Sequence, residues 1–180
     1  MASAFTHAFV GYALATVYAG APTPRRLGLL AAGCAVLPDA DSLGFALGVP
    51  YGSVLGHRGL THSLAFAWLT GLVVTALAYR ELRPATPAFR GRALFFAAVT
   101  ASHGVLDALT SGGLGVAFFS PVGLGRYFFP WRPIAVSPLA PGRFFGRAAL
   151  RIIETELRWA WLPAIALVLA SLGIRRLRRG

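Results

Sequence analysis

The run ALFFAAVTASHGVLDAL, residues 93–109, is an apolar stretch with one histidine and one aspartate near its end. Its length is close to the ~17–25 residues that a helix needs to cross the hydrocarbon core of a membrane. His103 and Asp107 are four residues apart, which places them on one face of that helix. Ionisable side chains inside an apolar helix are costly and usually functional. This stretch therefore predicts a membrane helix with a polar site near one end.

Four more apolar stretches accompany this one. They cover residues 4–21, 27–37, 63–79 and 159–174, and the second of them is short and stops at Pro38. Frequent glycine and alanine inside them suits close helix packing in lipid. We therefore predict one domain over residues 1–180, an all-α integral membrane bundle of about five membrane helices.

The composition excludes several other classes of protein. Hydrophobic residues make up 56% of the chain and charged residues 13%, about half the ~25% typical of soluble domains. A disordered chain needs the opposite balance, and a soluble enzyme needs more polar surface. The one cysteine, Cys34, rules out an internal disulfide framework and a thiolate metal cluster.

The net charge of +11 comes from 17 basic residues, all arginine, against six acids. A nucleic-acid-binding protein would normally carry lysine and fewer apolar runs, so we expect no nucleic-acid partner. Arginines cluster in residues 22–26, 80–92 and 175–179, and such clusters at helix ends mark the cytoplasmic side of a membrane. We therefore expect a protein of the cell membrane, with a cytoplasmic C-terminus and helices that alternate from an external N-terminus.

The segment from residue 118 to 133 mixes aromatic residues, prolines and arginines. Proline excludes a regular helix there, and aromatic belts favour the membrane interface. We interpret the segment as an interfacial cap. Residues 142–157 could follow it as an amphipathic interfacial helix, with arginines along roughly one face, namely Arg143, Arg147, Arg151 and Arg158.

All four histidines and all three aspartates fall at the external end of this expected topology. Imidazole and carboxylate are ligands for zinc, and also for manganese or iron. Seven such groups exceed the three or four that one zinc uses, which indicates two divalent ions, in the first place two Zn²⁺. The candidate ligands are His7, Asp39, Asp41, His57, His62, His103 and Asp107. The alternatives are an interfacial role for His7 and a helix-capping turn for Asp39 and Asp41.

We expect other polar residues beside these ligands to contact the substrate or to orient the ligands. Arg58 lies between two candidate ligands and could hold a phosphate oxygen and stabilise developing charge, or be only an interfacial anchor. We assign catalytic roles to Arg58 and Asp41, and contacts with substrate to Arg58 and Arg126. The expected hydrogen-bond partners that orient the ligands are Thr61, Ser63 and Thr110.

The order of these motifs resembles the YdjM-like membrane-bound metal-dependent hydrolases of bacteria and archaea. The resemblance covers roughly residues 1–135, and its most specific part is His57 through Ser63. Its elements are His7, Pro38-Asp39-Ala40-Asp41, His57 through Ser63, His103 through Thr110, and the stretches Phe119-Ser120-Pro121 and Arg126-Tyr127-Phe128. That family is distantly similar to zinc-dependent phospholipases C and single-strand nucleases, in which a His-x-x-x-Asp pair supplies metal ligands.

The resemblance implies that His103 and Asp107 bind metal and that the substrate is a phosphoester, with a phospholipid the natural choice. We therefore expect a membrane-bound metal-dependent hydrolase that cleaves a lipid or lipid-linked phosphoester with a metal-activated water. One alternative is a transporter of metal ions or small solutes, although its polar groups should be spread through the membrane depth. The other is a non-catalytic membrane protein with a closed, structural metal site.

Overall fold

A computed structural model describes residues 1–138 and 147–179, and in that part of the chain every regular element is helical. Two isolated bridges, Thr110 with Ile134 and Val116 with Tyr127, are the extended pairings found there. The prediction of an all-α protein is confirmed. The elements are α1 (Ala4–Ala19), α2 (Arg25–Val36), η1 (Leu37–Leu47), η2 (Leu60–His62), α3 (Leu64–Ala78), α4 (Pro87–Ala108), α6 (Arg147–Glu156), η3 (Leu157–Trp161) and α7 (Leu162–Leu177).

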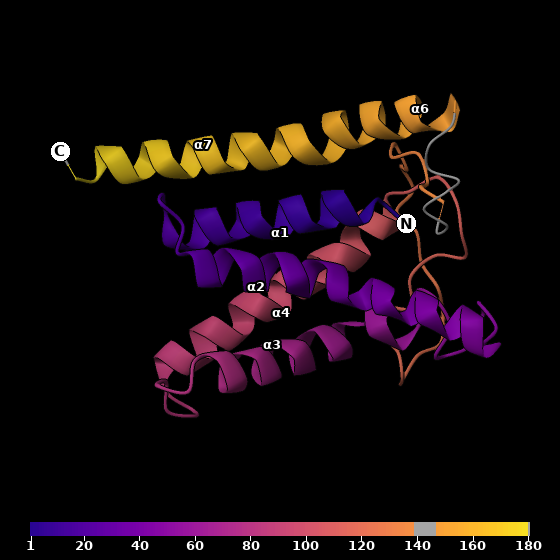
Figure 1. The fold of residues 1–180 in the computed structure, drawn as a ribbon, viewed down its shortest axis with the longest axis horizontal. Helices are drawn as coiled ribbons and strands as arrows, with labels where there is room; N and C mark the ends of the chain where they lie inside the picture. The colour runs from indigo at the N-terminus through magenta and orange to yellow at the C-terminus, as the bar shows by residue number, and fades with distance from the viewer. Residues whose placement is uncertain (139–146, 180) are drawn as a thin grey trace.

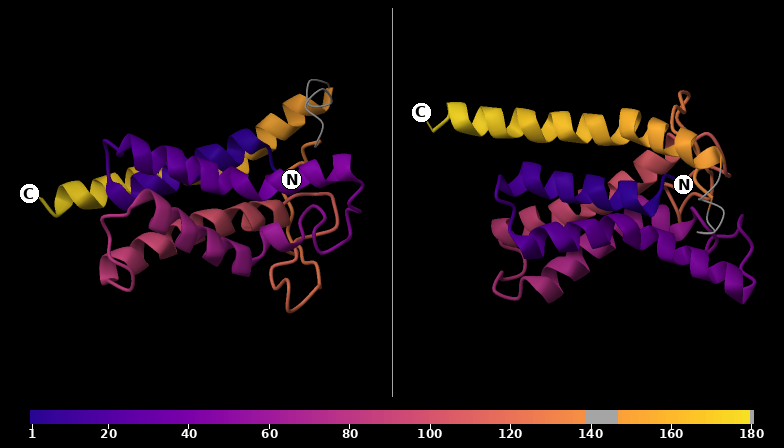
Figure 2. Two further views of the ribbon diagram at one scale, coloured as in Figure 1. Left: turned by 60° about the horizontal axis from the view of Figure 1, so that its bottom comes forward. Right: turned by 45° about the horizontal axis from the view of Figure 1, so that its top comes forward.

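The long helices run side by side with alternating direction (Figures 1 and 2). α1 packs against α2, and α3 packs against α4, so the first four helices form two hairpins, with α4 also in contact with α1 and α2. α7 packs along the outside of α1. The N-terminus lies at one end of the bundle and the C-terminus at the other (Figure 1).

Small residues let the helices of each hairpin approach closely. A Cβ atom added at Gly11 of α1 would lie 2.6 Å from the carbonyl oxygen of Ala31 on α2. One added at Gly71 of α3 would clash with the carbonyl oxygen of Ala93 on α4. Contacts of this kind replace the hydrophobic driving force, which is weak between helices surrounded by lipid.

Polar and apolar side chains are distributed in the reverse of the usual soluble pattern. Large apolar side chains of the helices face outward, among them Phe5, Leu77 and Leu169, whereas charged side chains such as Arg58 and Asp107 are fully buried. Exposed apolar surface on this scale marks a lipid or protein contact. This distribution suits a protein whose solvent is the bilayer.

Two helical runs, Arg25–Leu47 and Ala149–Leu177, have the length and hydropathy of a membrane span, while α1 and α3 are apolar but shorter. The predicted number of five membrane helices is therefore not confirmed. The first run passes through Pro38, where we expected it to stop, because the chain continues as the 3₁₀ helix η1. Proline is tolerated there because it occupies the first turn of η1, where no backbone N–H is needed.

The C-terminal part also differs from expectation. α6 does not form a separate interfacial helix but runs through the π-helix η3 into α7 as one long rod (Figure 1). Arg143 and the rest of residues 142–146 lie outside the described residues. The aromatic and arginine-rich segment is irregular, as proline predicts, and it covers the end of the bundle where the N-terminus lies.

Candidate metal centre

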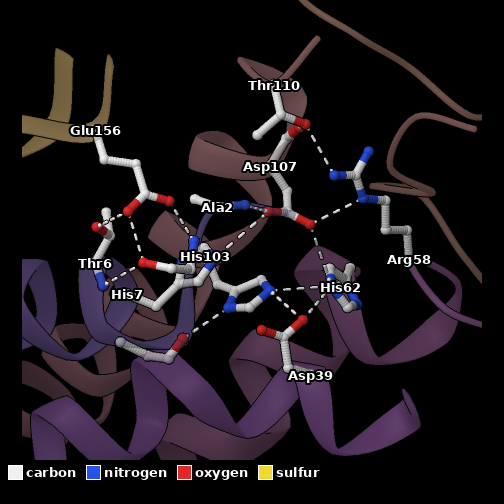
Figure 3. Close-up of polar contacts among 12 residues, drawn as sticks. Ala2, Thr6, His7, Asp39, Arg58, His62, His103, Asp107, Thr110 and Glu156 are labelled. Atoms are coloured by element: carbon white, nitrogen blue, oxygen red, sulfur yellow. Dashed lines mark hydrogen bonds and ion pairs between the residues drawn. The ribbon is translucent and has the colours of Figure 1, made fainter. Parts of the chain in front are cut away.

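Four elements bring the predicted ligands to the same end of the bundle. His7 comes from α1, Asp39 and Asp41 from η1, and His103 and Asp107 from the last turns of α4. The loop after η1 and the short helix η2 supply His57 and His62. Figure 3 shows five of the seven, which are drawn from α1, η1, η2 and α4.

Four of these side chains form one compact group of ligand atoms. Asp39, His62, His103 and Asp107 are all buried, and each offers an atom within 4.8 Å of the others. The His62 and His103 Nε2 atoms are 3.0 Å apart. Asp39 Oδ1 lies 3.3 Å from His103 Nε2 and 3.7 Å from His62 Nε2, and Asp107 Oδ2 lies 3.8 Å from His62 Nε2.

These four separations, from 3.0 to 3.8 Å, are close to the edges of a coordination tetrahedron. Ligand atoms held about 2.0–2.2 Å from one zinc ion in a tetrahedron lie roughly 3.3–3.6 Å from one another. The two imidazoles, moreover, meet through their Nε2 atoms, which can form a hydrogen bond only if one of the two carries a proton. His103 Nδ1 donates to the carbonyl oxygen of Ala35 at 2.7 Å, and His62 Nδ1 lies 3.1 Å from Asp41 Oδ2.

When both rings are neutral with their protons on Nδ1, both Nε2 atoms present lone pairs to each other. Both oxygens of Asp39 are buried and accept no hydrogen bond from the described residues. In that state the two lone pairs and the carboxylate repel one another unless a proton or a metal cation lies between them. The donor set therefore fits a divalent ion such as zinc.

A second group of ligand atoms joins the first through His62. It consists of Asp41, His57 and His62. Asp41 Oδ1 is 2.7 Å from His57 Nδ1, which is hydrogen-bond geometry, and the buried His57 Nε2 has no partner. A carboxylate that accepts a hydrogen bond from Nδ1 commonly orients a histidine so that its Nε2 faces a metal. Burial lowers the pKa of His62, but the carboxylates of Asp39, Asp41 and Asp107 outweigh it and raise that pKa above its ordinary value.

His7 lies beside the four-atom group but belongs to neither group. Its ring stacks on His103 with the centroids 3.7 Å apart, and its Nε2 is 3.4 Å from Asp107 Oδ1. Both ring nitrogens are buried and lack a hydrogen-bond partner among the described residues. The ligand role expected of His7 therefore remains a prediction.

Arg58 is fully buried, and its guanidinium donates three hydrogen bonds to other groups of the protein. Nε donates to Asp107 Oδ2 at 2.9 Å, Nη1 to the carbonyl oxygen of Gly112 at 2.8 Å, and Nη2 to Thr110 Oγ1 at 2.9 Å. A Cβ at Gly113 would lie 2.6 Å from Nη1, so the glycine makes room for this side chain. The backbone of Arg58 itself has a φ of 63°, a conformation that non-glycine residues seldom adopt away from functional sites.

The three hydroxyls predicted to orient ligands have different partners. Thr61 Oγ1 donates to Asp41 Oδ2 at 2.6 Å, as expected of an orienting group. Thr110 donates to the backbone carbonyl oxygen of Asp107 and accepts from Arg58, so it affects the Asp107 carboxylate only through Arg58. Ser63 instead caps α3, because its Oγ accepts from the N–H of Phe66.

Arg126, the predicted substrate contact, holds the loop that carries His57. Its Nη1 donates to the carbonyl oxygen of His57 at 2.9 Å, and its Nη2 to those of Tyr51 and Ser53 at 3.1 Å. It is half-buried. Burial lowers the pKa of Arg126, although an arginine keeps its charge at any pH in a cell.

Sequence analysis missed one acidic residue of this region, Glu156. It lies at the end of α6 and is buried, and it accepts hydrogen bonds from the N–H and the hydroxyl of Ser3 and from the hydroxyl of Thr6 (Figure 3). The N–H of Ala2 in turn donates to Asp107 Oδ1 at 2.8 Å. The sequence offers two acids just before the apolar stretch of residues 159–174, Glu154 and Glu156, and does not show which of them is buried.

Residues 1–179 match the family described as YdjM inner membrane protein. The chain belongs to the YdjM family. A relative, "Inner membrane protein YbcI" of Escherichia coli (strain K12), is 38% identical over 168 residues, which are 93% of this chain and 95% of the relative. No solved structure matches the chain.

The YdjM match confirms the resemblance seen in the sequence and extends it. The motifs suggested a likeness over about residues 1–135, whereas the family match also includes α6, η3 and α7. Membership makes the chain a membrane protein. Its buried aspartates and histidines form a group that could hold a metal ion.

Proposed function

We propose that this YdjM-family protein is a metal-dependent membrane hydrolase that cleaves phosphoester bonds of a lipid or lipid-linked substrate. The observation that carries the proposal is the pair of imidazole Nε2 atoms, on His62 and His103, that face each other at 3.0 Å beside an unpartnered carboxylate. Such an arrangement is unfavourable without a cation and suits a zinc ion. Manganese and iron accept the same ligands.

Asp39, His62, His103 and Asp107 would hold a divalent ion. That ion would act as a Lewis acid and would make hydroxide available from water as a nucleophile at neutral pH. The protein contributes orientation and a free base. Asp41 holds the proton of His57 on Nδ1, so that the unpartnered Nε2 is the atom able to take up a proton. We therefore assign proton transfer to His57 and a positioning role to Asp41.

Burial of the ligands also favours a second candidate, a structural metal site. Four protein ligands complete a tetrahedron and leave no open position, which is typical of structural zinc. Asp39 has the most exposed side chain of the four, at 9%, so it is the ligand that a substrate could displace. The number of ions remains a prediction too, since Asp41, His57 and His62 could hold the second Zn²⁺ expected from the sequence, and His57 would then be a ligand in place of a base.

The apolar surface around this end supports a lipid substrate. Leu47, Leu55 and Val122 are among the most exposed apolar side chains of the loops there, and Phe119 and Trp131 are exposed as well. Side chains of this kind lie favourably at the membrane interface. We propose that the metal centre lies on the external face of the cell membrane and the C-terminus in the cytoplasm, because the arginine clusters lie at the other end.

The test is metal analysis of the purified protein together with hydrolysis of a panel of phosphoester and carboxylester lipids. Bound zinc and chelator-sensitive cleavage of phosphoesters, restored by added zinc, support the proposal. Bound metal without cleavage of any lipid favours the structural site. Cleavage of carboxylesters alone contradicts the phosphoester assignment.

A further inference from the structure

The end of the bundle opposite the metal centre carries a cluster of arginines and tyrosines from five helices. Tyr79, at the end of α3, is buried. Arg26 of α2 and Arg92 of α4 both stack on its ring, with Cζ 4.6 Å and 4.4 Å from the centroid. Arg92 also lies 5.4 Å from the ring of Tyr18, at the end of α1. Arg175 of α7 completes the cluster by donating to the carbonyl oxygen of Tyr18 at 3.0 Å.

This cluster has no acidic counterpart. The ion pairs of the described residues all lie at the metal centre. Glu81, two residues after Tyr79, is exposed and takes part in none of them. Like charges gathered in this way repel one another, and a bound anion would relieve that repulsion.

One donor in the cluster is also left without a partner. Arg92 Nε is buried and makes no hydrogen bond with the described residues. A buried N–H without an acceptor is costly, and the contacts with two tyrosine rings hold the guanidinium in place. Arg92 is therefore a fixed guanidinium whose Nε lacks an acceptor among the described residues.

We propose that Arg26 and Arg92, held against Tyr79, bind the phosphate group of an anionic phospholipid. The planar guanidinium matches phosphate oxygens with two parallel hydrogen bonds. Basic pockets between helix ends at a membrane surface are suited to such headgroups. The proposal is independent of the metal centre and of its reaction.

Exposed leucines beside the cluster favour a lipid over free phosphate. Leu29 lies one turn after Arg26 on α2, and Leu77 lies in the last turn of α3, just before Tyr79. Their side chains are 58% and 63% exposed. They offer apolar contact for the acyl chains of a lipid whose phosphate is held by the arginines, and inorganic phosphate would make no use of them.

The experiment measures lipid binding to the purified full-length protein in detergent by native mass spectrometry. The probes are phosphatidylglycerol, phosphatidylcholine and inorganic phosphate. We expect wild type to prefer phosphatidylglycerol, and Arg26→Gln and Arg92→Gln each to weaken its binding about tenfold. The matched controls are Arg25→Gln and Arg90→Gln, which remove the same charge from exposed neighbours on the same helices; we expect less than about a twofold change.

A lysine variant separates the guanidinium fork from its charge. Arg92→Lys should still lose about half or more of the binding, because lysine lacks the planar fork. Helical circular dichroism and metal content identify any variant that fails to fold, and Arg92→Lys then replaces Arg92→Gln in the comparison. Equal weakening by Arg90→Gln would show a diffuse charge effect and overturn the site. Binding of inorganic phosphate as strong as that of phosphatidylglycerol, or no preference over phosphatidylcholine, would overturn the lipid assignment.

Discussion

Single nitrogen atoms decide how the aspartates and histidines can act. His103 Nδ1 is hydrogen-bonded to the carbonyl oxygen of Ala35 and His62 Nδ1 to Thr61 Oγ1, so both Nε2 atoms can face one ion. We predict that His103→Ala lowers zinc affinity at least about 100-fold, because loss of a ligand costs more than loss of an orienting partner. Metal content after dialysis at a fixed free zinc concentration measures this.

The matched control for that prediction is His7→Ala. His7 stacks on His103 but lies outside the four-atom group. If the four-ligand site is correct, this variant keeps its metal. Loss of metal from His7→Ala as complete as from His103→Ala would restore the original prediction that His7 is a ligand.

Arg58 has two possible roles that one substitution can separate. Arg58→Lys keeps the charge near Asp107 but cannot keep all three bonds to Asp107, Gly112 and Thr110. If Arg58 stabilises charge on a substrate phosphate, the substitution raises the activation barrier by about 2–4 kcal/mol, so turnover falls, while metal content stays unchanged. If it only positions Asp107, metal affinity falls in parallel with turnover. Measuring both quantities on the same preparation decides between the roles.

At the scale of elements, Glu156 connects the C-terminal rod to the start of α1. Its carboxylate accepts from Ser3 and Thr6, and Trp161 in η3 donates to the same Thr6 hydroxyl at 2.7 Å. A glutamine has only one acceptor oxygen, so Glu156→Gln leaves a buried donor unpaired. We predict a loss of about 1–3 kcal/mol in the free energy of unfolding.

Thermal unfolding in detergent checks this prediction, with Glu154→Gln as its control. Glu154 precedes Glu156 by two residues and is exposed, so its replacement should change stability by less than about 0.5 kcal/mol. Equal stability of the two variants would show that the buried contacts of Glu156 contribute nothing. A drop in metal affinity only in Glu156→Gln would show that the start of α1 helps to position Asp107 through Ala2.

At the scale of the whole molecule, the two ends of the bundle differ in charge and in polarity. One carries the aspartates and histidines together with further arginines, among them Arg58, Arg126 and Arg132, and the other carries ten arginines and one acid, Glu81. Arginine-rich ends remain in the cytoplasm. We predict that Val122→Cys, in an exposed loop beside the metal centre, is labelled from outside intact cells, and that Leu177→Cys is labelled only after permeabilisation.

Wild type serves as the blank in that labelling, because its one cysteine, Cys34, is buried. The reverse pattern would place the metal centre in the cytoplasm. It would leave the gathering of the ligands at one end unchanged, since that depends only on the alternating direction of the helices.

The sequence by itself determined the helical class, the membrane environment and the end of the bundle where the site lies. Hydropathy and helical spacing are local properties, so they predicted four of the five long helices closely, as for α3, expected at residues 63–79 and found at Leu64–Ala78. Local signals failed where the backbone has a choice. Pro38 could end a helix or begin one, and in the structure it lies in the first turn of η1, which follows α2 directly.

Only the tertiary structure decided which atoms meet. Arg58 is 49 residues from Asp107, and Glu156 is 153 residues from Ser3. Spacing along the chain carries no information about such pairs, because they depend on how the helices pack and on which rotamer that packing leaves open. The same holds for the partners of the histidine Nδ1 atoms, the carbonyl oxygen of Ala35 for His103 and the hydroxyl of Thr61 for His62. Residue types therefore predicted a metal centre, but its four-atom geometry exists only once α4, η1 and η2 lie side by side.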